Sequence, residues 1–203
     1  MRKISKLMSV FALVLFAGTA FSAPEVGQPA PDFSMVDTNG KQVSLADLKG
    51  KVVVMEWTNH GCPYVKKHYN SDNMQALQQE ASAENVVWVS VISSAPGKQG
   101  AVNAQEANAM ATEKGATPAH LVLDPEGTLG KSYDARTTPH MFVINKEGNV
   151  AYMGGIDDKP TADQADIESA NNYVRAALSD IKSGKDVSTP TSRPYGCSVK
   201  YAS

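Results

Sequence analysis

The most constraining feature of this sequence is the stretch at residues 52–68. Val52 to Met55 form an apolar, mostly β-branched run, which is typical of a buried strand in a parallel sheet. Polar and turn-forming residues follow, and then come Cys62 and Pro63. Proline is best tolerated in the first turn of a helix. The pattern therefore places a thiol at the carboxyl end of a central strand and at the amino end of the next helix.

This placement favours the ionised form of Cys62. Free backbone N–H groups and the helix dipole both stabilise an anion at a helix start, so we expect the pKa of the thiol to be lowered. The thiolate is the form that attacks disulfides and peroxides. The sequence therefore predicts a redox or nucleophilic cysteine, with a buried structural thiol and one half of a permanent disulfide as the alternatives.

The first 22 residues have the features of a secretory signal peptide. Three basic residues precede an apolar core at residues 7–17, which is too short to span a membrane as a mature helix. Residues 20–22 fit a small-x-small cleavage site, so we expect the mature chain to start near Ala23 and to be periplasmic or secreted. No stable membrane association is expected after cleavage; an uncleaved anchor is the alternative. Disulfides persist in such oxidising compartments.

Composition and motifs exclude several functions. The chain has 19 basic and 21 acidic residues and no long basic run beyond the N-terminus, so nucleic-acid binding is not supported. No nucleotide, flavin or haem motif is present, and we predict no cofactor. His60 and His68 lie near Cys62, but no second Cys or His pair completes a tetrahedral site, so no metal is predicted.

The only other cysteine is Cys197, and neither cysteine belongs to a Cys-x-x-Cys motif.

Strand and helix patterns alternate along the chain. Strands are predicted at residues 33–36, 41–43, 52–55, 86–92, 120–123, 141–144 and 150–153. Helices are predicted at residues 44–48, at 62–83 with a break near 70–73, at 104–114 and at 165–181. This order indicates an α/β sandwich around a mixed sheet. Residues 184–203 form a C-terminal tail whose aromatic and apolar residues suggest that it docks on the domain.

Several short segments occur in an order found in one known family. They are residues 27–33, residues 43–54, Trp57, Cys62-Pro63, Thr138-Pro139 before a strand, and Glu147-Gly148. Together they resemble a thioredoxin-fold redoxin, in the group of the AhpC/TSA peroxiredoxins and the periplasmic thioredoxin-like reductases. The resemblance implies a thioredoxin-like (redoxin) domain at residues 23–183: a mixed central β-sheet flanked by helices, with an N-terminal hairpin extension.

The resemblance also implies roles for individual residues. Cys62 takes the nucleophilic position, while Val65 stands where thioredoxins carry their second cysteine. Glu56 matches a buried carboxylate that assists proton transfer; its alternative is a solvent-facing position at the strand end. Pro139 resembles the cis-proline beside the nucleophile, and Thr138 would offer its backbone to a bound thiol or peptide.

The peroxiredoxin pattern is matched in part. Pro63 follows the cysteine as in that family, but Asn59 stands three residues before it, and Thr58 lies one position further back. Arg136 resembles the arginine that steadies the thiolate and the peroxide. The catalytic candidates are Cys62, Cys197, Glu56 and Arg136. The substrate-binding candidates are Thr58, His60, Pro63, Thr138 and Pro139.

Three functions are compatible with these observations. The favoured hypothesis is an exported peroxiredoxin-like peroxidase, in which Cys62 attacks a hydroperoxide and Cys197 resolves the sulfenic acid. The second is a periplasmic thiol–disulfide oxidoreductase that acts on protein disulfides. Both need a thiol reductant, which the sequence does not identify. The third is a non-catalytic thioredoxin-fold binding protein with a structural Cys62–Cys197 disulfide. Whether the two cysteines pair within one chain stays open.

Overall fold

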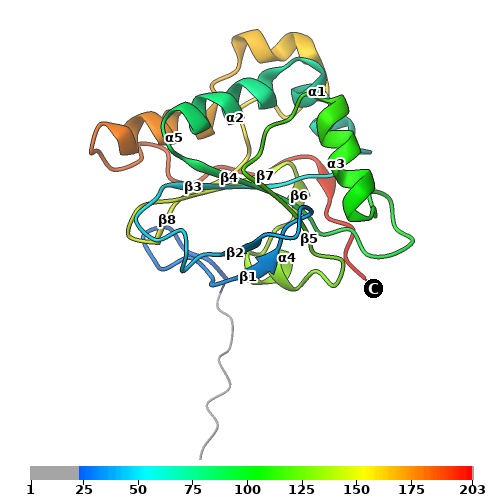
Figure 1. The fold of residues 1–203 in the computed structure, drawn as a ribbon. Helices are drawn as coiled ribbons and strands as arrows, with labels where there is room; N and C mark the ends of the chain where they lie inside the picture. The colour runs from blue at the N-terminus through cyan, green and yellow to red at the C-terminus, as the bar shows by residue number, and fades with distance from the viewer. Residues whose placement is uncertain (1–22, 203) are drawn as a thin grey trace, which may run out of the picture.

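The computed structural model describes residues 23–202, so the predicted signal peptide lies outside the described residues. Five strands form the central sheet in the order β5-β4-β3-β7-β8 (Figure 1). Strands β3, β4 and β5 are parallel to one another, whereas β7 is antiparallel to both β3 and β8. The bounds are β3 (Val53–Trp57), β4 (Val87–Ile92), β5 (His120–Leu123), β7 (His140–Ile144) and β8 (Val150–Gly154). The predicted mixed sheet is confirmed.

The central strand is covered on both faces. All five residues of β3 are buried, which explains the apolar run that ends at Met55. Helices α2 (Asn73–Ala83) and α5 (Tyr173–Lys182) cover one face, and helix α4 (Thr128–Ser132) with an N-terminal hairpin covers the other (Figure 1). Helix α1 (Pro63–Asn70) lies beside α2, and α3 (Ala104–Glu113) packs against β5.

The N-terminal part confirms one prediction and corrects another. Strands β1 (Ser34–Val36) and β2 (Gln42–Ser44) form the expected antiparallel hairpin around the Asn-Gly turn. The helix predicted at residues 44–48 is wrong, because this segment consists of successive turns. Its backbone bonds, such as that from Leu48 N to Leu45 O, span three residues, and Gly50 N bonds instead to Lys146 O. The chain therefore leaves the turn before an α-helical bond forms.

Of two predictions about helix boundaries, one is confirmed and one is wrong. The predicted break near residues 70–73 is confirmed, with Asp72 in the left-handed region at φ 58° between α1 and α2. The single helix predicted at residues 165–181 is wrong: a 3₁₀ helix, η1 (Gln164–Ser169), precedes α5. Between them Asn171 bonds to Asp158, and Tyr173 N bonds to Ile156 O, so contacts to another segment interrupt the helix.

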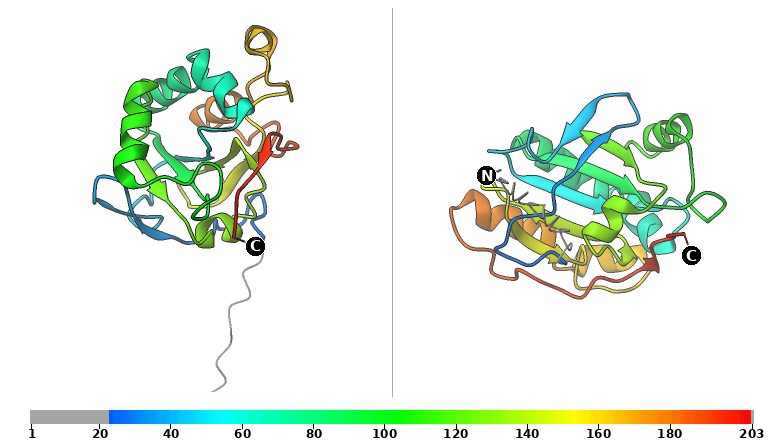
Figure 2. Two further views of the ribbon diagram at one scale, coloured as in Figure 1. Left: turned by 90° about the vertical axis from the view of Figure 1, so that its right-hand side faces the viewer. Right: turned by 90° about the horizontal axis from the view of Figure 1, so that it is seen from below.

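The C-terminal tail docks on the domain. After α5 it returns along β8, where Ser192 N bonds to Met153 O, and continues toward α1 (Figure 2). Its strand β9 (Cys197–Ser198) pairs antiparallel with β6 (Thr137–Thr138), which places Cys197 opposite Thr138. This path brings Cys197 to Cys62, which follows the carboxyl end of β3 in the chain. Within residues 23–202, no helix has the length and apolar character that crossing a membrane requires.

Candidate active site

Cys62 lies at the junction that the sequence predicts. It directly precedes α1 with an extended backbone, and Pro63 opens the helix. The side chain of Asn59 organises the loop before it, because Asn59 Oδ1 accepts a hydrogen bond from Gly61 N at 2.9 Å. Cys62 N donates to Asn59 O, also at 2.9 Å. Cys62 is fully buried.

Two segments from distant parts of the chain contact the Cys62 sulfur. The Thr138–Pro139 peptide bond is cis, and the carbonyl oxygen of Thr138 lies 3.1 Å from Cys62 Sγ, to which the protonated thiol donates. Cys197 Sγ lies 2.8 Å from Cys62 Sγ, although 135 residues separate the two cysteines. Both are free thiols in this structure. The fold therefore brings the two cysteines of one chain into direct contact.

The surroundings lower the pKa of the Cys62 thiol and raise that of the Cys197 thiol. Burial by itself raises the pKa of Cys62, but hydrogen bonds with the side chains of Cys197 and Thr138 and with the backbone of Val65 outweigh it and lower this pKa. Burial and the hydrogen bond to Cys62 raise the pKa of Cys197 to about 11. Cys62 is therefore the more acidic of the two thiols and the first to ionise.

Glu56 is fully buried under α1, so the solvent-facing alternative is excluded. Its carboxylate accepts hydrogen bonds from Tyr69 Oη at 2.9 Å, Trp88 Nε1 at 3.0 Å and Ser90 Oγ at 2.9 Å. Burial raises the pKa of Glu56 although these bonds act in the opposite direction. Sequence reasoning missed the three donors. Ser90 stands opposite Glu56 in the β3/β4 register, which no local pattern reveals.

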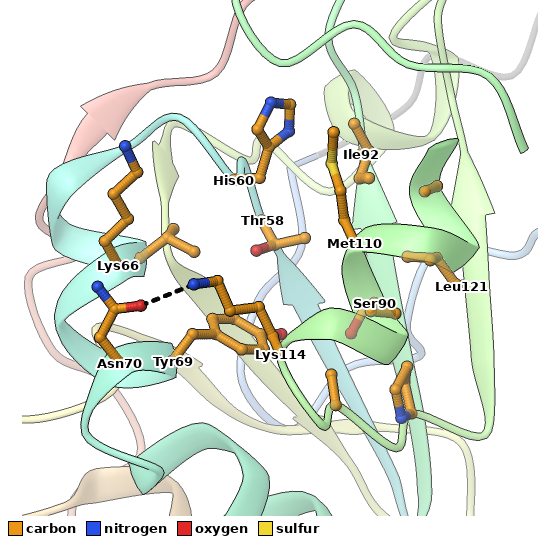
Figure 3. Close-up of a pocket in the computed structure, with 15 residues that line it drawn as sticks. Thr58, His60, Lys66, Tyr69, Asn70, Ser90, Ile92, Met110, Lys114 and Leu121 are labelled. Carbon is orange, nitrogen blue, oxygen red and sulfur yellow. Dashed lines mark hydrogen bonds between the residues drawn. The ribbon is translucent and has the colours of Figure 1, made fainter. Parts of the chain in front are cut away.

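The other predicted site residues differ in whether they lie with the two cysteines. Thr58 and His60 line a pocket between α1 and α3, and His60 is exposed (Figure 3). The side chain of Arg136 is 70% exposed. Its guanidinium donates both of its hydrogen bonds to Asp134, and within residues 23–202 it bonds to neither cysteine sulfur. The structure thus brings together Cys62, Cys197, Thr138 and Pro139, and leaves the Arg136 guanidinium apart from them.

The pocket in Figure 3 has a volume of about 80 Å³ and does not include Cys62. Its lining is mainly apolar, with Ile92, Met110 and Leu121 on one side. Lys114 Nζ donates to Asn70 Oδ1 at 3.1 Å beside it. In the part of the chain that the structure describes, no three His, Cys, Asp or Glu side chains are grouped so that they could hold a metal ion.

A cysteine with a lowered pKa, at a helix start beside a cis-proline on a thioredoxin-like sheet, is the framework of thiol redox enzymes. The protein has this framework on a thioredoxin-like fold. The sequence model of the Redoxin family matches residues 25–172, which is most of the chain, and the protein belongs to this family.

Two relatives come from Bacillus subtilis (strain 168). Thiol-disulfide oxidoreductase ResA is 30% identical over 124 residues, which cover 61% of this chain and 64% of that protein. The chain thus spans less than two thirds of this relative. Sporulation thiol-disulfide oxidoreductase A is 25% identical over 152 residues, which cover 71% of this chain and 86% of that protein.

Solved structures share the fold at low sequence identity. The hypothetical protein SMc02350 from Sinorhizobium meliloti 1021 has a TM-score of 0.72 at 21% identity, covering 90% of this chain and 97% of its own. A putative Thiol:disulfide interchange protein DsbE from Chlorobium tepidum has a TM-score of 0.53 at 22% identity, covering 64% of this chain and 85% of its own. These likenesses establish the thioredoxin-like fold.

Proposed function

We propose that this protein is an exported thiol–disulfide oxidoreductase in which Cys62 is the nucleophile and Cys197 the resolving thiol. The observation that carries the proposal is the 2.8 Å contact between a thiol of lowered pKa and one of raised pKa. A pair with this asymmetry has a defined order of attack, because the thiolate reacts first. The names of the two Bacillus relatives support disulfide exchange as the reaction.

The reaction proceeds in two exchange steps. The Cys62 thiolate attacks one sulfur of a substrate disulfide, whose S–S bond breaks, and the other substrate sulfur leaves as a thiolate that takes up a proton. Cys197 then loses its proton and attacks Cys62, and the second substrate thiol leaves. The substrate disulfide is reduced to two thiols, and the protein dithiol is oxidised to a Cys62–Cys197 disulfide. An external thiol reductant regenerates the dithiol.

Access to Cys62 requires movement of the tail. Cys62 is fully buried, and β9 occupies the backbone edge at Thr138. When β9 leaves β6, the backbone of Thr138 becomes free to bind the chain that carries the substrate disulfide, with Pro139 beside it. The two steps are written without Glu56 and Arg136, whose side-chain hydrogen bonds within residues 23–202 go to residues other than the two cysteines.

A hydroperoxide is the second candidate substrate. The position of the second thiol on a distant tail favours it, because a sulfenic acid at Cys62 needs one nearby thiol to condense with, releasing water. In that reaction Cys62 attacks one peroxide oxygen, the O–O bond breaks, and an alcohol or water leaves. The pairing of Arg136 with Asp134 counts against this candidate, since the guanidinium expected to steady the peroxide is bonded to a carboxylate instead.

We also propose that residues 1–22 act as the signal peptide and that the domain works in the periplasm or outside the cell. An extracytoplasmic location supplies oxidised protein substrates and an environment in which disulfides persist. N-terminal sequencing of protein recovered from the periplasm of an expressing cell tests this, with Ala23 as the expected first residue. A cytoplasmic protein that keeps residue 1 would contradict it.

One experiment separates the candidate functions. The reduced protein is mixed with an oxidised protein substrate or with hydrogen peroxide, and the products are mapped by mass spectrometry. Disulfide exchange predicts a Cys62–Cys197 disulfide with the protein substrate, a trapped mixed disulfide at Cys62 in Cys197→Ser, and no reaction in Cys62→Ser. A fast reaction with peroxide alone would favour the peroxidase. Reaction with neither oxidant faster than an ordinary thiol would overturn both and leave the structural disulfide.

A further inference from the structure

A buried charged cluster lies on the face of α1 next to the tail, and the steps above do not use it. The side chains of Lys67 and His68 are 0% exposed and that of Asp157 is 1% exposed. Lys67 Nζ donates to Lys159 O at 2.8 Å and lies 3.7 Å from Asp157 Oδ2. Charged side chains are rarely buried so completely, because the free-energy cost of removing a charge from water often exceeds the gain from its ion pairs. The complete burial of this cluster therefore indicates a specific structural role.

Tyr195 of the tail completes this cluster. Its hydroxyl donates to Asp157 Oδ1 and lies 3.3 Å from His68 Nε2. Its ring packs edge-on against Tyr64 at a centroid distance of 5.9 Å, and Lys67 Nζ lies 5.7 Å from its centroid. Thus a single residue of the tail contacts every side chain of the cluster.

The hydrogen bonds define a direction through the cluster. Burial, followed by the charge of Lys67, lowers the pKa of His68 to about 3, so its ring is neutral. Asn73 Nδ2 lies 2.8 Å from His68 Nδ1 and donates to it, which leaves the ring proton on Nε2. His68 therefore donates to the Tyr195 oxygen, and Tyr195 donates to Asp157. Without this hydroxyl, the His68 N–H would lose its acceptor and the Asp157 carboxylate would lose a donor.

Asp157 is already short of partners. Among the described residues its Oδ2 is buried with no hydrogen bond, and it faces Lys67 at 3.7 Å and His68 at 3.9 Å. Its other oxygen accepts from Lys159 N at 2.9 Å and from Tyr195. The cluster is consequently sensitive to the loss of one donor, since a buried carboxylate with too few hydrogen bonds is strongly disfavoured.

We propose that Lys67, His68 and Asp157 form a clamp for Tyr195, and that Tyr195 is a positioning residue that holds Cys197 against Cys62. Cys197 follows Tyr195 by two residues, which span roughly 7 Å of extended chain. Fixing Tyr195 therefore confines the second thiol to the edge of β6 and raises its effective concentration at Cys62. This inference rests on the proposed redox role of the thiol pair and extends it to the residues that hold the tail.

The test measures that effective concentration in Tyr195→Phe. The protein is equilibrated with reduced and oxidised glutathione, and the ratio of the Cys62–Cys197 disulfide to the Cys62–glutathione mixed disulfide is quantified by mass spectrometry. Loss of the hydroxyl is expected to lower this ratio by about tenfold to a hundredfold, the effect of one unsatisfied buried group. Both species are folded, so a loss of global stability alone does not change the ratio.

The controls use residues outside and inside the clamp. Tyr173→Phe removes a hydroxyl that makes no hydrogen bond within the described residues, and it should leave the ratio unchanged. Asp157→Ala should lower the ratio, and adding Tyr195→Phe to it should lower it little further, because both changes remove the Tyr195–Asp157 hydrogen bond. A ratio in Tyr195→Phe equal to that of the wild type overturns the clamp. Failure of the wild type to form any Cys62–Cys197 disulfide overturns the proposed function instead.

Discussion

Gly196 is the position where a single added methyl group should separate the two thiols. It lies between Tyr195 and Cys197 with φ +126°, a region that residues with a side chain rarely adopt. A Cβ at this position would lie 2.1 Å from Thr138 O and 2.8 Å from Thr138 C. Backbone atoms cannot yield as the end of a flexible side chain can. In Gly196→Ala, strand β9 must therefore move away from β6.

The size of the effect follows from two contributions. A non-glycine residue held in a sparsely populated backbone region costs about 1–3 kcal/mol. The 2.1 Å contact adds a steric cost to the docked state, and crowding of this kind costs about 1–3 kcal/mol. A total of about 3 kcal/mol corresponds to a shift of about a hundredfold toward the released tail, at 1.36 kcal/mol per tenfold.

Alkylation of Cys62 measures this shift. The thiol is 0% exposed in the docked state, so iodoacetamide reaches it only when the tail opens. Alkylation of the reduced protein, mapped to Cys62 by mass spectrometry, should be about a hundredfold faster in Gly196→Ala than in the wild type.

Gly184→Ala provides the matched control. Gly184 also has a positive φ, +68°, but no atom lies within 4 Å of a Cβ added there. This variant carries a comparable backbone cost at the root of the tail without the contact at Thr138, so Cys62 should stay protected within a few-fold. If Cys62 in Gly196→Ala is as protected as in the wild type, the tail does not cover the thiol in solution, and the reasoning from the β6/β9 pairing is wrong.

Two further predictions concern the buried polar groups. Ser90→Ala removes a donor from the Glu56 carboxylate and should lower the free energy of unfolding by about 1–3 kcal/mol, measured by urea unfolding. Ser82 is exposed, so Ser82→Ala should change the free energy of unfolding little. Equal effects of the two substitutions would show that the hydrogen bonds to Glu56 add no net stability. The folded-state pKa of His68, about 3, lies below its ordinary 6.5, so the neutral ring stabilises the fold above pH 6.5 and this contribution is lost as the pH falls toward 3. At pH 5 the free energy of unfolding is expected to be about 2 kcal/mol lower than at pH 7 because of His68. His68→Asn should lack this part of the pH dependence. If the pH dependence of the variant equals that of the wild type, His68 is protonated at pH 5 in the folded protein.

Local sequence patterns were sufficient for the framework of the site. A β-branched apolar run followed by Cys62 and Pro63 predicts a strand, a loop and a helix start, because each preference acts within a few residues. The Asn-Gly turn of the first hairpin was predictable for the same reason. The order of short segments that resembles the redoxins located Pro139, whose peptide bond is cis in the structure. These features depend on neighbouring residues, so they can be recognised in the chain itself.

The partners of the site depend on contacts between distant segments. Cys197 meets Cys62 across 135 residues because the tail pairs with β6, and no local preference encodes that path. Arg136 has the residue type expected at the thiol, yet its guanidinium pairs with Asp134 two residues away. The helix expected at residues 165–181 is interrupted for a similar reason, since Asn171 finds its partner at Asp158. Long-range hydrogen bonds and burial compete with local propensity, and where they are stronger, three-dimensional packing sets the geometry.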